Sequence, residues 1–473
     1  MDDLAFFNTI NNDRSSSENQ ESLLAPRSNK PLWKVPLATT ADVDAAVAAS
    51  QEAFRSWRQT PLEERQSQVR GLARLLEENK ALLSGIISQE TGKSTLMSDM
   101  EVDGSIDFLK FNAAQSLDDE IAFEDESLKI VTTYHPLGVV AAICPWNFPL
   151  VLAIAKVAAS LVTGNCMIIK PSPFTPYSTL KFVELASAIL PPGVLQALNG
   201  GGDVGAMLTQ HPGVQKLSFT GSAATGKRIM ASAAGSLKRI TLELGGNDGC
   251  IVCDDVDVER VAREVAMGCF FHAGQMCVAT KRVYVHRSVY PEFMTHFLRT
   301  VDGLKTDAPV EEPSVFGPIS NKMQFEIVKA LIEDCEKNGY EVLTGGTNGV
   351  GNGLWVSPTV VNNPPDDSRI VKEEQFGPII PIMIWDTENE VVRRVNDTDC
   401  GLGGSIWGKD QERIQRMARS LETSTVWLNT SPRPVPMGHM AGWKESGIGG
   451  EWGRQGLLAY CQVQTLQISK SQV

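Results

Sequence analysis

The chain has 473 residues, of which 42% are hydrophobic and 21% charged, and its formal net charge is −13. This length predicts about two to four domains with a large buried core, and the composition is typical of a folded globular protein. The acidic balance argues against nucleic acid as a partner, because it repels phosphate backbones.

Neither end of the chain carries a recognisable targeting signal. Met1-Asp2-Asp3 shows no basic region followed by an apolar stretch, and Lys470-Ser471-Gln472-Val473 is not a peroxisomal signal. The longest nearly apolar run, about 151–162, is interrupted by Lys156, so we expect no transmembrane helix and no membrane partner. Nine cysteines at irregular spacing favour reduced thiols and a cytoplasmic location.

Cys250 and Cys253 form a C-x-x-C pair, a spacing found in redox and zinc sites. A second cysteine pair or a helix start should accompany such a site, and neither is evident. The run 250–253 is apolar and typical of a buried strand. We therefore expect core residues here and no metal.

The N-terminal part is predicted to be an arm followed by helices. Residues 10–30 are polar and indicate an irregular arm. Thr40 is a candidate N-cap for a helix with Val43, Val47 and Phe54 on one face. The run 60–63 (TPLE) has the pattern of a capped helix start with Thr60 as the cap. The helix that follows places three apolar side chains on one stripe, Val69, Leu72 and Leu76.

From Gly138 onward, short apolar runs alternate with longer helical stretches. Strands are predicted at 139–144, 167–169, 194–198, 214–219 and 240–244, and helices at 150–161, 178–189 and 226–234. This alternation predicts right-handed crossovers and a parallel, doubly wound sheet, which binds ligands at the carboxyl ends of its strands. A second α/β stretch covers about 257–422. The segment 457–468 alternates and predicts an edge strand for oligomer contact.

Two glycine-rich segments are candidates for a phosphate contact. Residues 200–205 (GGGDVG) resemble the dinucleotide fingerprint only loosely. Residues 219–227 (FTGSAATGK) follow a predicted strand and open a predicted helix, where free N–H groups favour an anion. An ordinary strand-to-helix turn would use the same glycines.

Five separated motifs resemble the aldehyde dehydrogenase superfamily in order and spacing, from Val35-Pro36 to the closing strand. They are PWNFP at 145–149, KPS at 170–172, ELGG at 243–246, GQMC at 274–277 and EEQFGP at 373–378. The resemblance implies a Rossmann-like cofactor domain, an α/β catalytic domain and a small β oligomerisation element. Their expected limits are 1–115 with 137–244, 245–445, and 116–136 with 446–473. A homodimer or homotetramer is expected, bridged by the strands near 128–134 and 457–468.

The resemblance also implies a mechanism, in which NAD(P)+ oxidises an aldehyde to a carboxylic acid. Cys277 is the expected nucleophile, since a thiolate converts the carbonyl into a hydride donor. Asn147, with the backbone N–H of Cys277, is expected to form the oxyanion hole. Glu243 is the expected base for thioester hydrolysis. Lys156 and Glu451 resemble a proton-passing pair, although an ordinary salt bridge would look the same.

Cofactor and substrate contacts are likewise implied by the resemblance. Lys170 would contact the adenosine ribose, Ser222 and its turn the diphosphate, and Glu374 the nicotinamide ribose, although Glu374 also fits a plain helix-end charge. The expected cofactor residues are Ile143, Pro145, Trp146, Lys170, Ser172, Gly201, Gly221, Ser222, Thr225, Leu244, Gly245, Glu374 and Phe376. The expected substrate pocket is Phe148, Leu152, Phe271, Met276 and Val278, which suits a medium aliphatic or aromatic aldehyde.

The chain departs from the family pattern at three places. Pro173 stands where NAD-preferring members carry a glutamate, so we expect NAD+ with NADP+ tolerated. Gly450 replaces an arginine before Glu451. The loop 431–441, which includes Arg433, is longer than the usual turn and should border the substrate tunnel. A coenzyme A-dependent enzyme and a non-catalytic relative are the alternatives. The presence of Glu243 argues against the first, and the presence of Asn147, Glu243 and Cys277 together argues against the second.

Overall fold

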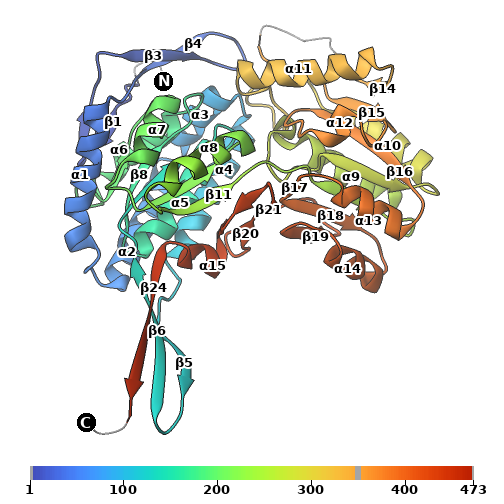
Figure 1. The fold of residues 1–473 in the computed structure, drawn as a ribbon. Helices are drawn as coiled ribbons and strands as arrows, with labels where there is room; N and C mark the ends of the chain where they lie inside the picture. Colours follow the sequence, from blue (N-terminus) through green and yellow to red (C-terminus); the bar gives the residue numbers. More distant parts are fainter. Residues whose placement is uncertain (1–3, 347–352, 471–473) are drawn as a thin grey trace.

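The computed structural model describes residues 4–346 and 353–470, which form two α/β lobes and a projecting β arm (Figure 1). Met1-Asp2-Asp3 and the last three residues of the chain, on which the targeting-signal predictions fall, lie outside the described residues. Within the described part, no helix is long and apolar enough to cross a membrane.

The first sheet confirms the predicted parallel, doubly wound architecture. Its strand order is β2-β1-β9-β8-β7-β10-β11-β22, and β7 to β11 are parallel. Counted from β7, this parallel part has the order 3-2-1-4-5, so the order reverses beside β7, where such sheets bind ligands. The strands are β1 (Asn8–Ile10), β2 (Asp13–Ser15), β7 (Val139–Ile143), β8 (Cys166–Lys170), β9 (Leu195–Ala197), β10 (Lys216–Thr220), β11 (Arg239–Glu243) and β22 (Gly447–Ile448).

Helices cover both faces of this sheet. Alternate residues of β7 enter two separate cores: Val140 and Ala142 pack with α2 to α6, whereas Val139 and Ala141 pack with α1, α7 and α8. The helices are α1 (Thr40–Trp57), α2 (Leu62–Glu78), α3 (Lys80–Thr91), α4 (Thr95–Asn112), α5 (Pro149–Val162), α6 (Tyr177–Ala186), α7 (Gly202–Gln210) and α8 (Ala223–Ala234). The predicted stripe of α2 is fully buried.

Three N-terminal predictions were wrong in detail. The arm at 10–30 is not irregular, because β1 and β2 extend the first sheet and β3 (Gln20–Leu24) pairs with β4 (Pro31–Pro36). The N-cap of α1 is Thr39 rather than Thr40, with a complete capping box to Asp42. Helix α2 begins one residue later than predicted, and Thr60 makes no cap bond to it, since its hydroxyl donates to the carbonyl of Ser56.

The chain enters a second sheet directly after β11, through the short segment 244–248. The order there is β14-β15-β16-β13-β12-β18-β19, packed around a core that includes Cys250 and Cys253 as buried, free thiols. The strands are β12 (Gly249–Val252), β13 (Arg282–His286), β14 (Glu341–Thr344), β15 (Thr359–Asn362), β16 (Ile379–Trp385), β18 (Gly403–Trp407) and β19 (Thr425–Leu428). The helices are α9 (Val258–Phe270), α10 (Tyr290–Asp302), α11 (Lys322–Lys337), α12 (Arg369–Lys372), α13 (Glu388–Asn396) and α14 (Gln411–Arg419).

The projecting arm is a three-stranded sheet with the order β24-β6-β5 (Figure 1). Its strands are β5 (Glu120–Glu124), β6 (Leu128–Pro136) and β24 (Cys461–Ser469). The predicted strand at 457–468 was wrong at its start, where the chain is still in helix α15 (Gly453–Leu458). Short antiparallel pairs join β17 (Cys400–Gly401) to β21 (Trp443–Lys444) and β20 (Met440–Ala441) to β23 (Gly450–Glu451). The domain limits expected from the sequence, 1–115 with 137–244, 245–445, and 116–136 with 446–473, stay a prediction.

Candidate active site

A cavity of about 860 Å³ opens at the carboxyl ends of β7, β8, β10 and β11. Every residue predicted to contact the cofactor lines it: Ile143, Pro145, Trp146, Lys170, Ser172, Gly201, Gly221, Ser222, Thr225, Leu244, Gly245, Glu374 and Phe376. Cys277, Asn147 and Leu152 line the same cavity. Motifs spread over more than 200 positions of the chain therefore meet on one surface.

Two helix N-termini meet this cavity. The Ser222 side chain caps α8 by accepting from the N–H of Thr225, 3.4 Å away, and leaves the other first-turn N–H groups near the cavity. The glycine run at 200–205 was not predicted to be helical, yet it opens α7, and Gly201 and Gly202 line the cavity. A Cβ at Gly202 would meet no atom within 4 Å. This open, N–H-rich edge fits a diphosphate.

Lys170 is a buried cation at the end of β8. Its ammonium donates to the carbonyl of Pro171, at 3.0 Å, and burial lowers its pKa to about 8. The charges of Asp203 and Glu21 oppose that shift, so two acidic groups act on Lys170 from neighbouring elements. Pro173 lines the cavity here and supplies no charge. Either acid could disfavour a second phosphate near Lys170.

Cys277 follows a strained turn. Between α9 and Cys277, the backbone of His272, Ala273 and Gly274 is left-handed, with φ of 50°, 53° and 73°, which costs about 1–2 kcal/mol for each residue other than glycine. The buried Gln275 side chain stabilises the turn by donating to the carbonyls of His272 (2.9 Å) and Pro318 (3.0 Å). This turn projects Cys277 into the cavity.

The Cys277 thiol is half-buried and surrounded by charge. Burial raises its pKa to about 12. The ammonium of Lys281 opposes this rise, whereas the carboxyl groups of Asp248, Glu374 and Glu243 add to it. Burial is therefore the main obstacle to proton removal from this thiol, and the nearby cation and acidic groups modify its effect.

Asn147 lines the same cavity as Cys277 and is held there by hydrogen bonds to its side chain and to its backbone carbonyl. Its Nδ2 donates to the carbonyl of Gln275, 2.9 Å away, just before Cys277 in the chain. An amide nitrogen carries two protons, so the second stays available for a ligand.

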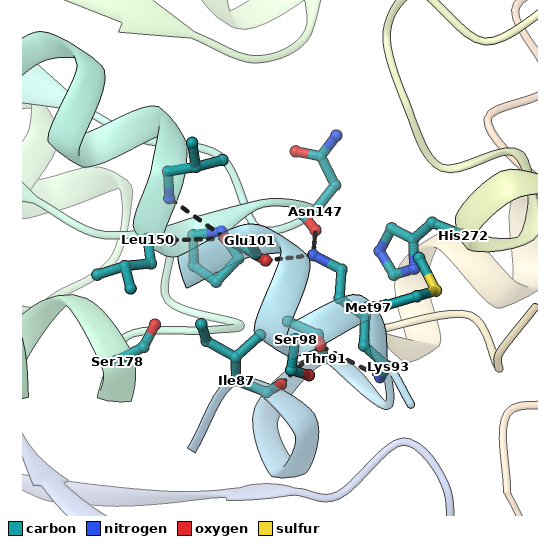
Figure 2. A network of polar contacts seen from close by, with 12 residues as sticks. Ile87, Thr91, Lys93, Met97, Ser98, Glu101, Asn147, Leu150, Ser178 and His272 are labelled. Carbon is teal, nitrogen blue, oxygen red and sulfur yellow. Dashed lines mark hydrogen bonds and ion pairs between the residues drawn. The ribbon is translucent and has the colours of Figure 1, made fainter. Parts of the chain in front are cut away.

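A buried ion pair between Lys93 and Glu101 contacts the backbone of Asn147 (Figure 2). The ammonium of Lys93 donates to the Asn147 carbonyl at 2.7 Å and to Glu101 at 2.5 Å, and it lies 3.7 Å from the centre of the Phe148 ring. The other oxygen of Glu101 accepts from the N–H of Leu150 at 2.9 Å, at the start of α5. Lys93 and Glu101 side chains are fully buried. Both were missed in the sequence, although a lysine and a glutamate that are both fully buried are unusual. Lys93 lies in the loop before α4, and Glu101 lies on α4.

Glu243 ends β11 with a carboxyl group that is poorly satisfied. Among the described residues, its Oε1 has no hydrogen-bond partner, and the side chain is buried. Burial, and then the charge of Glu451, raise its pKa well above the ordinary value of a glutamate, against the opposing charge of Lys156. A carboxylate of this kind is a stronger base than an exposed one.

Lys156 and Glu451 form the predicted pair. The ammonium of Lys156 on α5 lies 2.6 Å from Glu451 Oε1 and donates to the Thr220 hydroxyl at 2.9 Å. The Ser218 hydroxyl donates to the same Glu451 oxygen. Strand β22 pairs with β11 and brings the C-terminal segment to Glu243, although Gly450 replaces the usual arginine. Whether this pair passes protons stays a prediction.

The predicted substrate residues differ in their burial and packing. Phe148 and Phe271 stack with ring centres 6.5 Å apart, and Leu152 lines the cavity. Met276 is half-buried and packs against a cluster in which Val278, Leu402 and Met440 are buried. At the start of the loop 431–441, the Ser431 hydroxyl donates to the Glu264 carbonyl at 2.8 Å. Arg433 in the same loop is exposed.

Comparisons with known proteins find matches over nearly the whole chain. A family model described as the aldehyde dehydrogenase family matches residues 13–466. The chain is 39% identical over 465 residues to the putative aldehyde dehydrogenase FUS7 of Gibberella moniliformis, covering 98% of this chain and 99% of that protein. It is 37% identical over 472 residues to the aldehyde dehydrogenase LUC3 of Fusarium sp, covering 99% and 100%.

Solved structures extend the comparison. An aldehyde dehydrogenase from Bacillus cereus in complex with NAD+ matches with a TM-score of 0.96 and 32% identity, over 99% of this chain and 98% of that one. A betaine aldehyde dehydrogenase from Staphylococcus aureus in complex with NAD+ matches with a TM-score of 0.95 and 30% identity, over 100% and 96%.

Proposed function

The chain belongs to the aldehyde dehydrogenase family and oxidises an aldehyde, and we propose that it uses NAD+ and forms a thioester on Cys277 that is hydrolysed to the carboxylic acid. The observation that carries the proposal is the single cavity lined by Cys277, Asn147 and every predicted cofactor residue. The NAD+ complexes of the Bacillus cereus and Staphylococcus aureus relatives support the choice of cofactor.

The residues of the cavity fit a dinucleotide. Lys170 would hold the adenosine ribose, the N-terminus of α8 with Ser222 the diphosphate, and Glu374 the nicotinamide ribose. A Cβ at Gly245 would lie 2.2 Å from Glu374 Oε2, so this glycine lets the carboxylate reach the cavity wall. Bound NAD+ would supply the acceptor for the hydride that leaves the substrate.

Cys277 and Asn147 perform the first step. The Cys277 thiol loses its proton to water, and the thiolate attacks the aldehyde carbon to form a thiohemiacetal, whose oxygen takes the electron pair of the C=O bond and becomes negatively charged. The C=O bond re-forms as hydride leaves the carbon, which gives the thioester. The free proton of Asn147 Nδ2 and the backbone N–H of Cys277 donate to that oxygen, and losing one such donor costs about 3 kcal/mol of barrier. The bond from Asn147 to the Gln275 carbonyl keeps this amide beside the thiol.

Glu243 performs the second step. Its unsatisfied Oε1 accepts a proton from water, and the resulting hydroxide attacks the thioester carbon. The C–S bond then breaks, which releases the acid and returns Cys277 as a thiolate. The raised pKa of Glu243 suits this task, because a stronger base removes the proton more readily. Lys156 and Glu451 lie close enough to influence its charge and would take the proton onward.

The substrate proposed is a medium aliphatic or aromatic aldehyde. The stacked Phe148 and Phe271 rings and Leu152 supply apolar surface. Absorbance at the NADH wavelength, measured with a panel of such aldehydes, tests the proposal. Turnover without coenzyme A supports hydrolysis, turnover that needs coenzyme A replaces it with acyl transfer, and no turnover with any aldehyde contradicts the proposal.

A further inference from the structure

A buried lysine lies beneath the nucleophile. Lys281 precedes β13, and its side chain is 2% exposed. Its ammonium donates to the carbonyls of Met276 at 2.7 Å, Cys277 at 3.0 Å and Ala279 at 3.3 Å. A buried cation is costly unless its protons are bonded and its charge is paired. This lysine therefore holds the loop that carries the thiol.

The bond to Met276 has a directional consequence. The carbonyl of Met276 and the N–H of Cys277 belong to one planar trans peptide, in which the two groups point in opposite directions. An ammonium fixed on the carbonyl therefore fixes the direction of the Cys277 N–H. Hydrogen bonding to a carbonyl also polarises its peptide, which strengthens the N–H as a donor.

The same ammonium reaches the cofactor side of the cavity. Lys281 Nζ lies 3.6 Å from Glu374 Oε1, an oxygen that also accepts from the N–H of Gly246 at 3.0 Å. It lies 5.7 Å from the centre of the Phe376 ring. Burial raises the pKa of Glu374, and Lys281 is the main influence against that rise. The lysine thus favours an ionised Glu374, which accepts hydrogen bonds from a ribose hydroxyl.

We propose that Lys281 is a positioning residue that couples the nucleophile loop to the cofactor carboxylate, orienting the Cys277 N–H and holding Glu374 as an anion. The proposal rests on the function proposed above. It predicts two effects that do not require turnover, one on the reactivity of the thiol and one on NAD+ binding. The thiol faces the acidic groups of Asp248, Glu374 and Glu243, and Lys281 is the cation that opposes them.

The test compares Lys281→Met, which removes charge and hydrogen bonds, with Lys281→Gln, which removes the charge and keeps an N–H donor. Lys181→Met is the matched control, because Lys181 is also buried, donates to a carbonyl (Ala5, 3.0 Å) and a glutamate (Glu184, 2.7 Å), and lies 5.3 Å from the Phe6 ring. The rate of alkylation by iodoacetamide is measured against pH without cofactor, and the rate of Cys277→Ala is subtracted.

In both Lys281 variants, the alkylation profile should move to higher pH, because the thiolate loses its stabilising cation. The Kd for NAD+, measured by titration, should rise roughly tenfold, the equivalent of one lost polar contact. In turnover, kcat should fall on the order of a hundredfold in Lys281→Met and less in Lys281→Gln, which can still bond the Met276 carbonyl. Lys181→Met should match the wild type in all three measurements.

Unchanged alkylation profiles and NAD+ affinity in the two Lys281 variants would overturn the proposal. Equal shifts in Lys181→Met would overturn it too, since they would follow from the loss of any buried lysine. If Lys281→Met does not fold, the alkylation profile and the NAD+ affinity of Lys281→Gln test the proposal. The thiol and binding measurements need no aldehyde, so they test Lys281 even if the wild-type protein turns over no aldehyde and the proposed function fails.

Discussion

Glu243→Gln should separate the two halves of the reaction. The substitution keeps the shape of the side chain and removes its ability to take a proton. The carboxyl group is buried, and its Oε1 has no partner among the described residues. In the proposed mechanism, hydride loss precedes hydrolysis, so only the second step needs this base. The variant should therefore form the thioester at nearly the wild-type rate and then stall.

The expected magnitude follows from the role of Glu243. A positioned general base contributes roughly 10²–10⁴ in rate, so steady turnover should fall by about that factor. The first turnover should still release about one NADH for each Cys277 thiol, as in other acyl-enzyme mechanisms. Rapid mixing with NAD+ and aldehyde, followed at the NADH wavelength, measures both the burst and the slow phase.

The pH dependence gives a second measurement. The base form of Glu243 is the carboxylate, and its pKa is raised mainly by burial. Wild-type deacylation should therefore fall as pH drops through a value well above the ordinary glutamate range of about 4.3. Glu243→Gln should lose this acidic limb, because the amide does not titrate.

Glu90→Gln is the matched control for this experiment. Glu90 is also buried, with a pKa raised to about 8, but it accepts from the N–H groups of Tyr177 and Ser178 outside the cavity. That variant should show wild-type phases in rapid mixing. Loss of the burst in Glu243→Gln with normal deacylation would refute the reasoning and place Glu243 before hydride transfer.

Four further predictions test the site and the assembly. Cys277→Ala should abolish aldehyde oxidation and keep NAD+ binding by titration; substantial turnover would exclude the thioester. Pro173→Glu should move the kcat/KM ratio toward NAD+ over NADP+, because a carboxylate beside Lys170 repels a 2′-phosphate; an unchanged ratio would indicate that Asp203 or Glu21 already excludes it. Lys93→Met should lower the free energy of unfolding by about 3–5 kcal/mol, since it leaves the fully buried Glu101 unpaired; thermal and denaturant unfolding measure this, and Glu101→Gln in the same chain should recover part of it. Light scattering should give a mass of two or four times 51.4 kDa, because β24 presents an exposed edge with half-exposed apolar side chains; a single-chain mass would contradict the predicted homo-oligomer.

The parallel sheet could be predicted because its strands are buried on both faces. Such strands appear in the sequence as short apolar runs separated by helices, and each predicted run from 139 to 244 lies within two residues of an observed strand. The N-terminal strands could not be predicted in this way. The residues of β2 are polar, two of the three are exposed, and they become a strand because β1 offers an edge that pairs with them.

The sequence by itself determined the chemistry that is local to a motif. It identified the thiol of Cys277, the amide of Asn147, the carboxyl group of Glu243 and the glycine turns, because each is encoded within a few adjacent residues. Asn147 and the glycine turns meet at one cavity because the carboxyl ends of parallel strands meet at one edge, whereas Cys277 reaches the same cavity from the second lobe. Glu243 ends β11 next to Leu244, which lines this cavity.

Only the tertiary structure decided which charges face these groups. Lys281 and Glu374 lie far apart in the chain, and Lys93 reaches the Asn147 carbonyl across 54 positions. No local spacing encodes these contacts. They arise where two lobes and separate helices pack together, and burial there removes the water that would otherwise screen the charges. The sequence motifs therefore predict which atoms react, whereas the packing around those motifs sets the direction and the acidity of these atoms.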